Sequence, residues 1–186
     1  IMSYDKENIF AKIIREEIIR NRSWVSPMCQ YSSEDGFSNN WHMVHLGSRA
    51  VGGAGLVMTE AAAVEPEGRI SPWDLGIWKD EHIPGLKEIT DFIISQGSTP
   101  AIQIAHAGRK ASTKRPWQGR GKILTEDGGW VPKGPSAIAF DEESQVPEEI
   151  SVTEIQKIID KFVSAAQRSV EAGFKCIELH LAHGYL

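Results

Sequence analysis

The sequence predicts an α/β protein built around a parallel sheet. Four short apolar segments with the character of buried strands alternate with longer segments whose apolar residues recur at helical spacing. The strand segments are apolar nearly throughout, as expected for strands that are covered on both faces. One strand with its helix and loops takes about 40 residues, so an eight-unit barrel needs roughly 250 residues or more. The 186 residues therefore predict either a four-unit open sheet or the front portion of a barrel.

The first two elements lie in the first 29 residues. A helix is expected in residues 1–20, because their apolar side chains are spaced approximately on one helical face. These side chains are Ile9, Phe10, Ile13, Ile14, Ile18 and Ile19. A short buried strand is expected at residues 24–29, where Pro27 must end the strand or lie at its edge.

The next helix and strand follow a polar loop at residues 32–40. Ser38 or Asn39 is expected to cap a helix that runs through residues 41–49 and is stopped by Gly52 and Gly53, because both residue types accept hydrogen bonds from a helix N-terminus. A second buried strand is expected at residues 55–59.

The third strand follows another predicted helix. Residues 81–96 carry an apolar helical face that ends at Gly97, and residues 99–105 form the third apolar strand. Residues 110–147 contain many glycines and prolines without a clear period. A loop of this length in a compact domain is unusual unless it has a function.

The last helix and strand have the clearest start signal. Ser151 and Glu154 have the spacing of a capping box, in which the two side chains satisfy each other's backbone N–H groups. A long amphipathic helix follows and ends near Gly173. The fourth strand is expected at residues 175–180.

Composition excludes several classes of protein. The chain has 25 acidic and 20 basic residues, a formal net charge of −5, and lacks the basic stripe that binds nucleic acid. It has no apolar run of ~20 residues that could cross a bilayer, and its first residues, with Asp5, Lys6 and Glu7 close together, are not expected to act as a signal peptide. The cysteines, Cys29 and Cys176, are far apart, as expected in a reducing compartment. We expect a cytoplasmic protein that binds neither nucleic acid nor membranes.

Polar side chains gather where each predicted strand ends. In parallel α/β proteins the carboxyl ends of the strands form the edge at which ligands bind, so these side chains are expected to meet in one site. The residues concerned are Cys29, Gln30, Tyr31, Glu60, Gln103, His106, Arg109, Lys110, His180, His183 and Tyr185.

The pair His180 and His183 allows three interpretations. With Glu178 nearby the two imidazoles could bind a metal, but no second cluster supplies a further ligand with clear spacing, so no metal is expected. His180 could instead be an inward-facing strand residue satisfied by its neighbours. Two imidazoles are better suited to holding negative charge on a carbonyl or nitro oxygen, with Tyr185 as the proton source.

The cysteines also have competing interpretations. Cys29 could be an acyl-transfer nucleophile with His106 or His183 as its base, or a structural thiol at a buried strand end. Cys176 is expected in the core. His42 and His45 share one helix face and are expected either to pack or to lie at a solvated edge. Met28, Met43 and Met58 are expected to fill gaps in the core.

Segments from about Asn21 onward resemble the Old Yellow Enzyme family of flavin-dependent ene-reductases, in the bacterial branch with a cysteine after the first strand. The family has a TIM (β/α)8 barrel that binds flavin mononucleotide (FMN) at the C-terminal face of its strands. The resemblance implies an N-terminal half of such a barrel, about four βα units, in residues 21–186. The matching segments are 26–32, 60–61, 68–69, 74–78, 103–110, 135–138, 172–174 and 180–186.

The resemblance also implies roles for individual residues. Tyr185 resembles the proton donor, His180 and His183 resemble the pair that binds the activating oxygen of the substrate, and Tyr31 resembles a substrate contact. The enzyme would transfer hydride from NADH or NADPH through the flavin to an α,β-unsaturated carbonyl or a related electrophile. Cys29 would adjust the redox behaviour of the flavin. The residues implied to line the flavin are Ser26, Pro27, Met28, Cys29, Ala61 and Gln103.

Two features depart from the family pattern. Residues 1–20 lack its proline-bearing opening and are expected to form an atypical N-terminal segment. The sequence ends at Leu186, before the strands that would carry a further arginine near the flavin and the phosphate-binding loops. An alternative is therefore a non-catalytic half-barrel that persists only by association, because an open sheet edge and apolar helix layer favour self-association. We expect a homo-oligomer.

Overall fold

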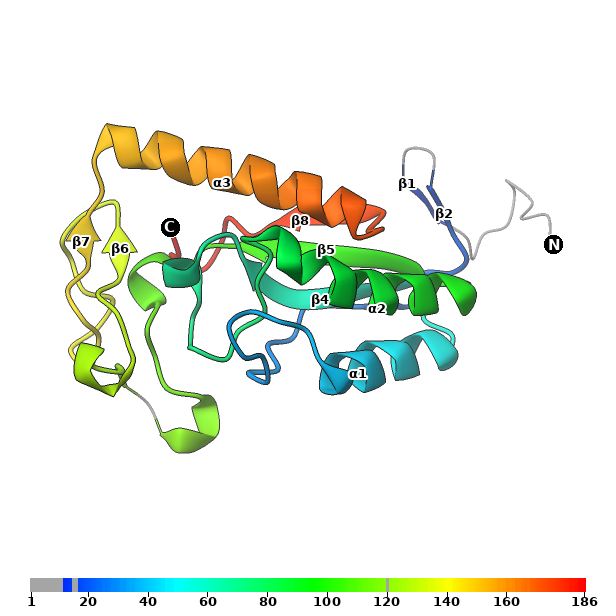
Figure 1. Ribbon diagram of the computed structural model, residues 1–186, viewed down its shortest axis with the longest axis horizontal. Coiled ribbons are helices and arrows are strands. Elements are labelled where there is room, and N and C mark those ends of the chain that lie inside the picture. Colours follow the sequence, from blue (N-terminus) through cyan, green and yellow to red (C-terminus); the bar gives the residue numbers. More distant parts are fainter. Residues whose placement is uncertain (1–11, 15–16, 120) are drawn as a thin grey trace.

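The computed structural model describes residues 12–14, 17–119 and 121–186. Four parallel strands form the main sheet in the order β3-β4-β5-β8, so β3 and β8 are its edges. The predicted parallel α/β architecture is confirmed (Figure 1). The strands are β3 (Trp24–Val25), β4 (Leu56–Ala63), β5 (Thr99–Ala105) and β8 (Cys176–Leu179), and the connecting helices are α1 (Asn40–Val51), α2 (Ile83–Ser95) and α3 (Val152–Glu171).

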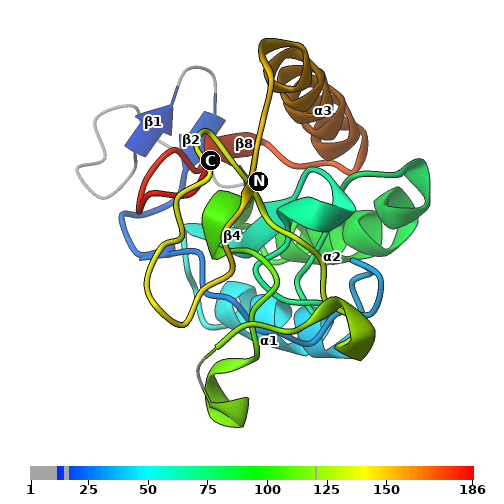
Figure 2. The same ribbon diagram turned by 90° about the vertical axis from the view of Figure 1, so that its left-hand side faces the viewer.

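The helices α1, α2 and α3 follow one another around one side of the sheet (Figure 2). Two buried apolar clusters fill the space between sheet and helices, as expected when helices pack on one face of parallel strands. The larger cluster includes Ala62, Leu86, Ile102, Ile104, Ala165 and Phe174, and the smaller one includes Leu46, Val57, Ile89 and Ile93.

The predicted capping residues start the helices. Asn39, one of two predicted caps for α1, accepts a hydrogen bond from the Trp41 backbone N–H at 2.9 Å. Ser151 and Glu154 form the predicted capping box of α3. The capping signals therefore locate the start of α3 to the residue and the start of α1 to within one residue.

The helix predicted in residues 1–20 is wrong wherever the structure describes it. β1 (Lys12–Ile14) and β2 (Glu17–Ile19) pair antiparallel, and residues 1–11, with Ile9 and Phe10, lie outside the described residues. Isoleucine is β-branched and favours extended backbone over helix. Ile19 is completely buried and packs against Leu56 and Ala101. Burial at the N-terminal end of the sheet thus outweighs the weak helical periodicity.

Arg20 fastens the chain at the same end of the sheet. Its guanidinium donates hydrogen bonds to the carbonyls of Ala50, Ala54 and Gln96 and to the Ser98 hydroxyl, at 2.9 to 3.2 Å. Ala50 and Gln96 lie at the C-terminal ends of α1 and α2, where unpaired carbonyls favour a cation. Arg20 therefore ties two helices and the segment after β2 together.

The first predicted strand is shorter and more exposed than expected. β3 covers only Trp24–Val25, and Trp24 and Met28 are 43% and 44% exposed, so a core role for Met28 is wrong. Pro27 cannot donate to a strand ladder. β3 also lies at a sheet edge with only β4 beside it. Cys176 in the other edge strand is half-buried for the same reason.

The long segment over residues 110–147 contains short elements and is not a structureless loop. It includes two single 3₁₀ turns and β6 (Lys133–Gly134), which pairs with β7 (Glu148–Glu149). Figure 1 shows this segment at the end of the sheet opposite to the β1–β2 hairpin, beside the C-terminal ends of the strands. Within the described ranges, no helix is long and apolar enough to cross a membrane.

Candidate functional site

Three neighbouring strands place side chains at one level near their C-terminal ends. Ala61, Gln103 and Glu178 are register partners across β4, β5 and β8, and the Gln103 amide donates to the Glu178 carboxylate at 2.6 Å. Ile104 packs toward the helices, so Gln103 points to the opposite face. His180 lies two residues beyond Glu178 and shares that face.

His180, His183 and Tyr185 form a ring cluster beyond β8. The imidazole centroids lie 5.2 Å apart and nearly perpendicular, and the His180 and Tyr185 ring centroids lie 4.8 Å apart. The Ala182 N–H donates to Nδ1 of His180 at 3.3 Å, so the neutral ring carries its proton on Nε2. Burial and His183 both lower the pKa of His180, which favours this neutral form.

The phenol of Tyr185 is held in its protonated form. Burial, followed by the charges of Cys29 and Asp74, raises its pKa to about 12. A phenol with this pKa keeps its proton at neutral pH and can donate it during a reaction. A cleft of about 710 Å³ opens beside Tyr185 and is also lined by Lys110 and Phe140.

The segment that carries Tyr185 lies directly against the end of β5. A Cβ on Gly108 would stand 2.6 Å from the Leu186 nitrogen, and the Gly108 φ of +57° is itself a conformation that favours glycine. The Leu186 N–H donates to the His106 carbonyl at 3.4 Å. The third and fourth strand ends are thus in contact.

Cys29 and Tyr31 approach from the first strand end. The Tyr31 side chain and the Ala61 backbone lie close to the Cys29 thiol and act on its pKa against the larger effect of burial. Burial, then the charges of Asp74 and Glu60, raises the pKa of Cys29 to about 12. A protonated thiol is a poor nucleophile, so the structure gives no support to the acyl-transfer hypothesis.

The preceding residues are at the surface. Ser26 and Met28 are exposed and Pro27 is half-buried, with the Met28 carbonyl accepting a hydrogen bond from the Gln30 amide at 2.7 Å. Tyr31 has a φ of 51°, a left-handed conformation that is uncommon outside glycine. Burial, then the charges of Cys29 and Asp74, raises the pKa of Tyr31. Tyr185 contributes to the same shift, so the first and fourth strand ends share one electrostatic environment.

Two buried carboxylate–imidazole pairs behind the site were not expected from the sequence. The Glu60 carboxylate is 3.1 Å from Nε2 of His42, and the Glu65 carboxylate is 2.7 Å from Nε2 of His106. Glu60 lies within β4 and Glu65 two residues beyond it, both among apolar residues, and a glutamate in such a place must have a partner when it is buried. The sequence shows a glutamate among apolar residues at both places, but it does not show which histidine pairs with each glutamate.

Glu65 binds cations in addition to its histidine. Its carboxylate forms ion pairs with Lys161 of α3 and, at 3.7 Å, with Lys133 of β6. Burial raises the pKa of Glu65, but hydrogen bonds from His106 and Lys161 and the Lys133 charge outweigh burial and lower the pKa to about 2. Glu65 thereby links the segment after β4 to α3, to β6 and to the end of β5.

His180 and His183 do not belong to a recognisable metal site. Among the residues that the structure describes, no group of three or more histidine, cysteine, aspartate or glutamate side chains could hold a metal ion. The His180 ring instead accepts a hydrogen bond from the Ala182 N–H and packs against the rings of His183 and Tyr185.

Solved structures of known proteins share this fold. Morphinone reductase superposes with a TM-score of 0.77 at 25% identity, over 92% of this chain and 46% of its own. An old yellow enzyme homologue from Zymomonas mobilis superposes with a TM-score of 0.79 at 25% identity, over 95% of this chain and 48% of its own. These matches confirm that the four strands are part of a TIM barrel.

Sequence comparison gives the same relationship. An NADPH dehydrogenase of Bacillus subtilis (strain 168) is 47% identical over 175 residues, which are 93% of this chain and 47% of the relative. An NADPH dehydrogenase of Bacillus cytotoxicus is 50% identical over 175 residues, 93% of this chain and 46% of the relative. The chain thus spans about half the length of the curated relatives that it matches. The model of the NADH:flavin oxidoreductase / NADH oxidase family matches residues 9–186, and the chain belongs to this family.

Proposed function

We propose that the full-length protein is an FMN-dependent ene-reductase that passes hydride from NADPH or NADH to an α,β-unsaturated carbonyl or a related electrophile. The observation that carries this proposal is the contact of His180 with Tyr185 at the strand ends, where the imidazole offers Nε2–H and the phenol keeps its proton. The family uses FMN together with NADH or NADPH. One solved relative is morphinone reductase in complex with tetrahydroNAD.

The strand ends fit a flat ring with polar edges. Gln103 offers an amide, Cys29 offers a protonated thiol, and Ala61 between them carries only a small methyl side chain. FMN, when bound, supplies the hydride that reduces the substrate. The residues that we propose to line the flavin are Ser26, Pro27, Met28, Cys29, Ala61 and Gln103.

The C-terminal cluster supplies the chemistry on the substrate side. We assign to His180 and His183 the binding of the substrate oxygen, where donated hydrogen bonds stabilise the negative charge that develops as hydride reaches the β-carbon. Tyr185 then gives its phenolic proton to the α-carbon. Tyr31, which shares an electrostatic environment with Tyr185, contacts the substrate.

The rest of the protein must complete this site. Residues 21–186 supply four strands of the flavin domain, and the remaining half would supply the other strands and the phosphate contacts. We further propose a cytoplasmic, homo-oligomeric enzyme in which residues 1–20 are an atypical N-terminal segment, of which Ile19 and Arg20 pack against the rest of the chain.

The test uses the full-length protein and its His180→Ala variant. We expect bound flavin absorbance and oxidation of NADPH or NADH in the presence of cyclohexenone. His180→Ala should lower turnover by about 10² to 10³, the usual cost of losing one such donor, with flavin content nearly unchanged. A full-length protein without flavin contradicts the proposal. Loss of flavin in His180→Ala contradicts the assignment of that residue.

A second candidate is a half-barrel that functions only by association. It is favoured by an apolar groove of about 610 Å³ along α3, which is lined by residues such as Ile155, Ile159, Phe162, Leu179 and Leu181. Sedimentation of the 186-residue chain tests it. A compact monomer that binds flavin with micromolar affinity contradicts this candidate, and a defined oligomer supports it.

A further inference from the structure

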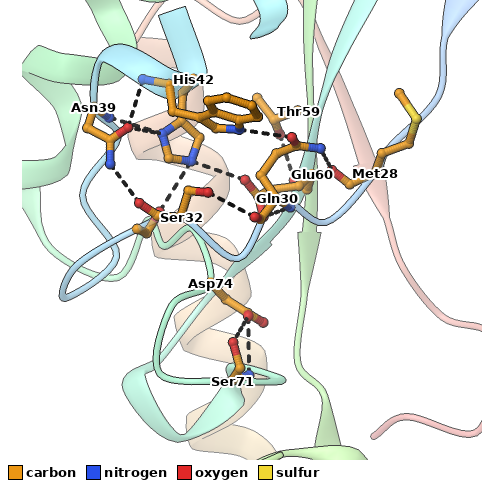
Figure 3. Close-up of polar contacts among 11 residues, drawn as sticks. Met28, Gln30, Ser32, Asn39, His42, Thr59, Glu60, Ser71 and Asp74 are labelled. Atoms are coloured by element: carbon orange, nitrogen blue, oxygen red, sulfur yellow. Dashed lines mark hydrogen bonds and ion pairs between the residues drawn. The ribbon is translucent and has the colours of Figure 1, made fainter. Parts of the chain in front are cut away.

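We propose that Glu60 is a positioning residue whose buried carboxylate acts through Gln30 to fix the Cys29–Tyr31 segment in the site. The proposal rests on the proposed function for the roles of Cys29 and Tyr31, whereas the clamp itself is a property of this chain alone. We call the hydrogen-bonded group Glu60, His42 and Gln30 the Glu60 clamp. Figure 3 shows it together with its neighbours.

The carboxylate binds two different elements through its two oxygens. Glu60 lies in β4 with its side chain 2% exposed, and Oε2 accepts the backbone N–H of Gln30 at 2.9 Å. Gln30 lies between Cys29 and Tyr31, so this bond fixes the peptide group that joins the thiol to the rest of the segment. Oε1 lies 3.1 Å from Nε2 of His42. Both oxygens are thus engaged by protein donors, which argues against a direct role for Glu60 on a substrate.

The proton on His42 follows from the backbone. The Asn39 N–H donates to Nδ1 of His42 at 3.0 Å, so Nδ1 carries a lone pair and the neutral ring carries its proton on Nε2. Nε2–H therefore points at Glu60, with the Ser33 hydroxyl as a second neighbour at 3.3 Å. Asn39 and His42 lie at the start of α1, so the clamp anchors the segment to this helix.

Gln30 is held by its side chain as well as by its backbone. The Trp41 indole N–H donates to its Oε1 at 3.0 Å, and its own amide donates to the Met28 carbonyl at 2.7 Å. The Ser32 hydroxyl donates to the Gln30 carbonyl at 2.9 Å. A residue whose donors and acceptors are all engaged cannot rotate without breaking several hydrogen bonds.

A carboxylate is required at this position because both partners are donors. In Glu60→Gln the new side-chain NH₂ group must point either at the Gln30 N–H or at the His42 Nε2–H. In both cases two donors face each other, and a buried donor is left without an acceptor. The substitution also removes a negative charge near Cys29. The charged and titratable groups that act on this thiol are Asp74, Glu60 and Tyr31, and the two carboxylates both favour the protonated thiol.

The test compares Glu60→Gln with Glu65→Gln in the full-length protein. Glu65→Gln is the matched control, because it alters the other buried carboxylate–imidazole pair without touching Gln30. The first measurement is the rate of Cys29 alkylation by iodoacetamide between pH 7 and 10, followed on the Cys29 peptide by mass spectrometry. The second is hydrogen–deuterium exchange of the peptide that contains the Gln30 amide.

In Glu60→Gln we expect iodoacetamide to alkylate Cys29 several-fold faster at pH 8, because loss of a nearby negative charge favours the thiolate, and we expect the Gln30 amide to exchange faster. Glu65→Gln should match the wild type within about twofold. Equal behaviour of Glu60→Gln and the wild type, or equal acceleration in both variants, overturns the proposal. Trp41→Phe at an exposed position removes one hydrogen bond to Gln30 and should accelerate exchange of the same peptide. No acceleration there overturns the clamp even if Glu60→Gln fails to fold.

The two proposals can fail separately. A full-length protein that holds no flavin, but in which Glu60→Gln changes Cys29 as expected, contradicts the proposed function and keeps the clamp. A flavin-bound, active protein with unchanged Cys29 reactivity in Glu60→Gln contradicts only the clamp.

Discussion

The two buried carboxylate–imidazole pairs behind the site share one geometry and differ in their other partners. In each, a backbone N–H donates to Nδ1 of the histidine, so that Nε2–H faces the carboxylate. Glu60 has the Gln30 backbone as its further partner, whereas Glu65 has two lysines. The comparison teaches that the same pair serves two purposes. With lysines it ties distant elements of the fold, and with a backbone amide it orders one wall of the site.

The largest expected effect of breaking either pair is that of Glu65→Ala. Removing this carboxylate leaves Lys161 and Lys133 without their shared anion and leaves the His106 N–H unpaired. Loss of one partner from a buried ion pair typically costs 3 to 5 kcal/mol, and the lysines can reach water, so we expect about 3 kcal/mol. Urea unfolding of the full-length variant measures it. A loss no larger than that of Glu60→Ala would remove the distinction between the pairs.

Gly108→Ala tests whether the contact between Gly108, which binds His106 of the Glu65 pair, and Leu186 positions Tyr185. The Gly108 N–H donates to Nδ1 of His106 at 3.0 Å, and an added Cβ would meet the Leu186 backbone at 2.6 Å. Overpacking of this kind costs roughly 1 to 3 kcal/mol, and we expect about 2 kcal/mol with slower protonation of the substrate. Urea unfolding and stopped-flow reoxidation of the reduced enzyme check both. Unchanged reoxidation would show that this contact does not position Tyr185.

Glu60→Ala is expected to destabilise less. It leaves the Gln30 N–H without its acceptor, whereas His42 keeps the Ser33 hydroxyl as a neighbour at 3.3 Å. One buried donor without a partner costs about 1 to 2 kcal/mol. The same urea titration measures it. A cost above that of Glu65→Ala would mean that the Glu60 clamp supports the whole fold and not one segment.

A difference in acid stability tests the Glu65 pair without removing its shape. The pKa of Glu65 lies at about 2 in the folded protein, below its ordinary value of 4.5, so its stabilisation is complete above about pH 4.5. It is lost as the pH falls through about 2, because the unfolded chain takes up the proton first. Between these values Glu65→Gln should show a flatter decline in the free energy of unfolding than the wild type. Parallel curves would contradict the ion-paired assignment.

Most of the fold could be predicted because it depends on local patterns. The capping box at Ser151 and the cap at Asn39 start α3 and α1 as expected, and the strand predicted at residues 99–105 is β5. The β1–β2 hairpin could not be predicted. It depends on the burial of Ile19 against strands that are distant in sequence, and periodicity within one window carries no such information.

The candidate site, like the fold, could be predicted only in part. The prediction that strand ends lie together agrees with two contacts between separate segments: the Leu186 N–H donates to the His106 carbonyl, and the charge of Cys29 acts on Tyr185. His42 was expected only to pack, and its pairing with Glu60 was not foreseen. The partners of a buried carboxylate come from other elements, and a single sequence does not show which histidine will face which glutamate.

Stopped-flow kinetics of full-length Tyr185→Phe test the central claim, that the C-terminal cluster acts on the substrate while the earlier strand ends hold the flavin. The account predicts reduction by NADPH or NADH within about twofold of the wild type. It predicts reoxidation by cyclohexenone that is slower by about 10² or more, because only that step takes the phenolic proton. Equal slowing of both half-reactions, or no change in reoxidation, would contradict the account.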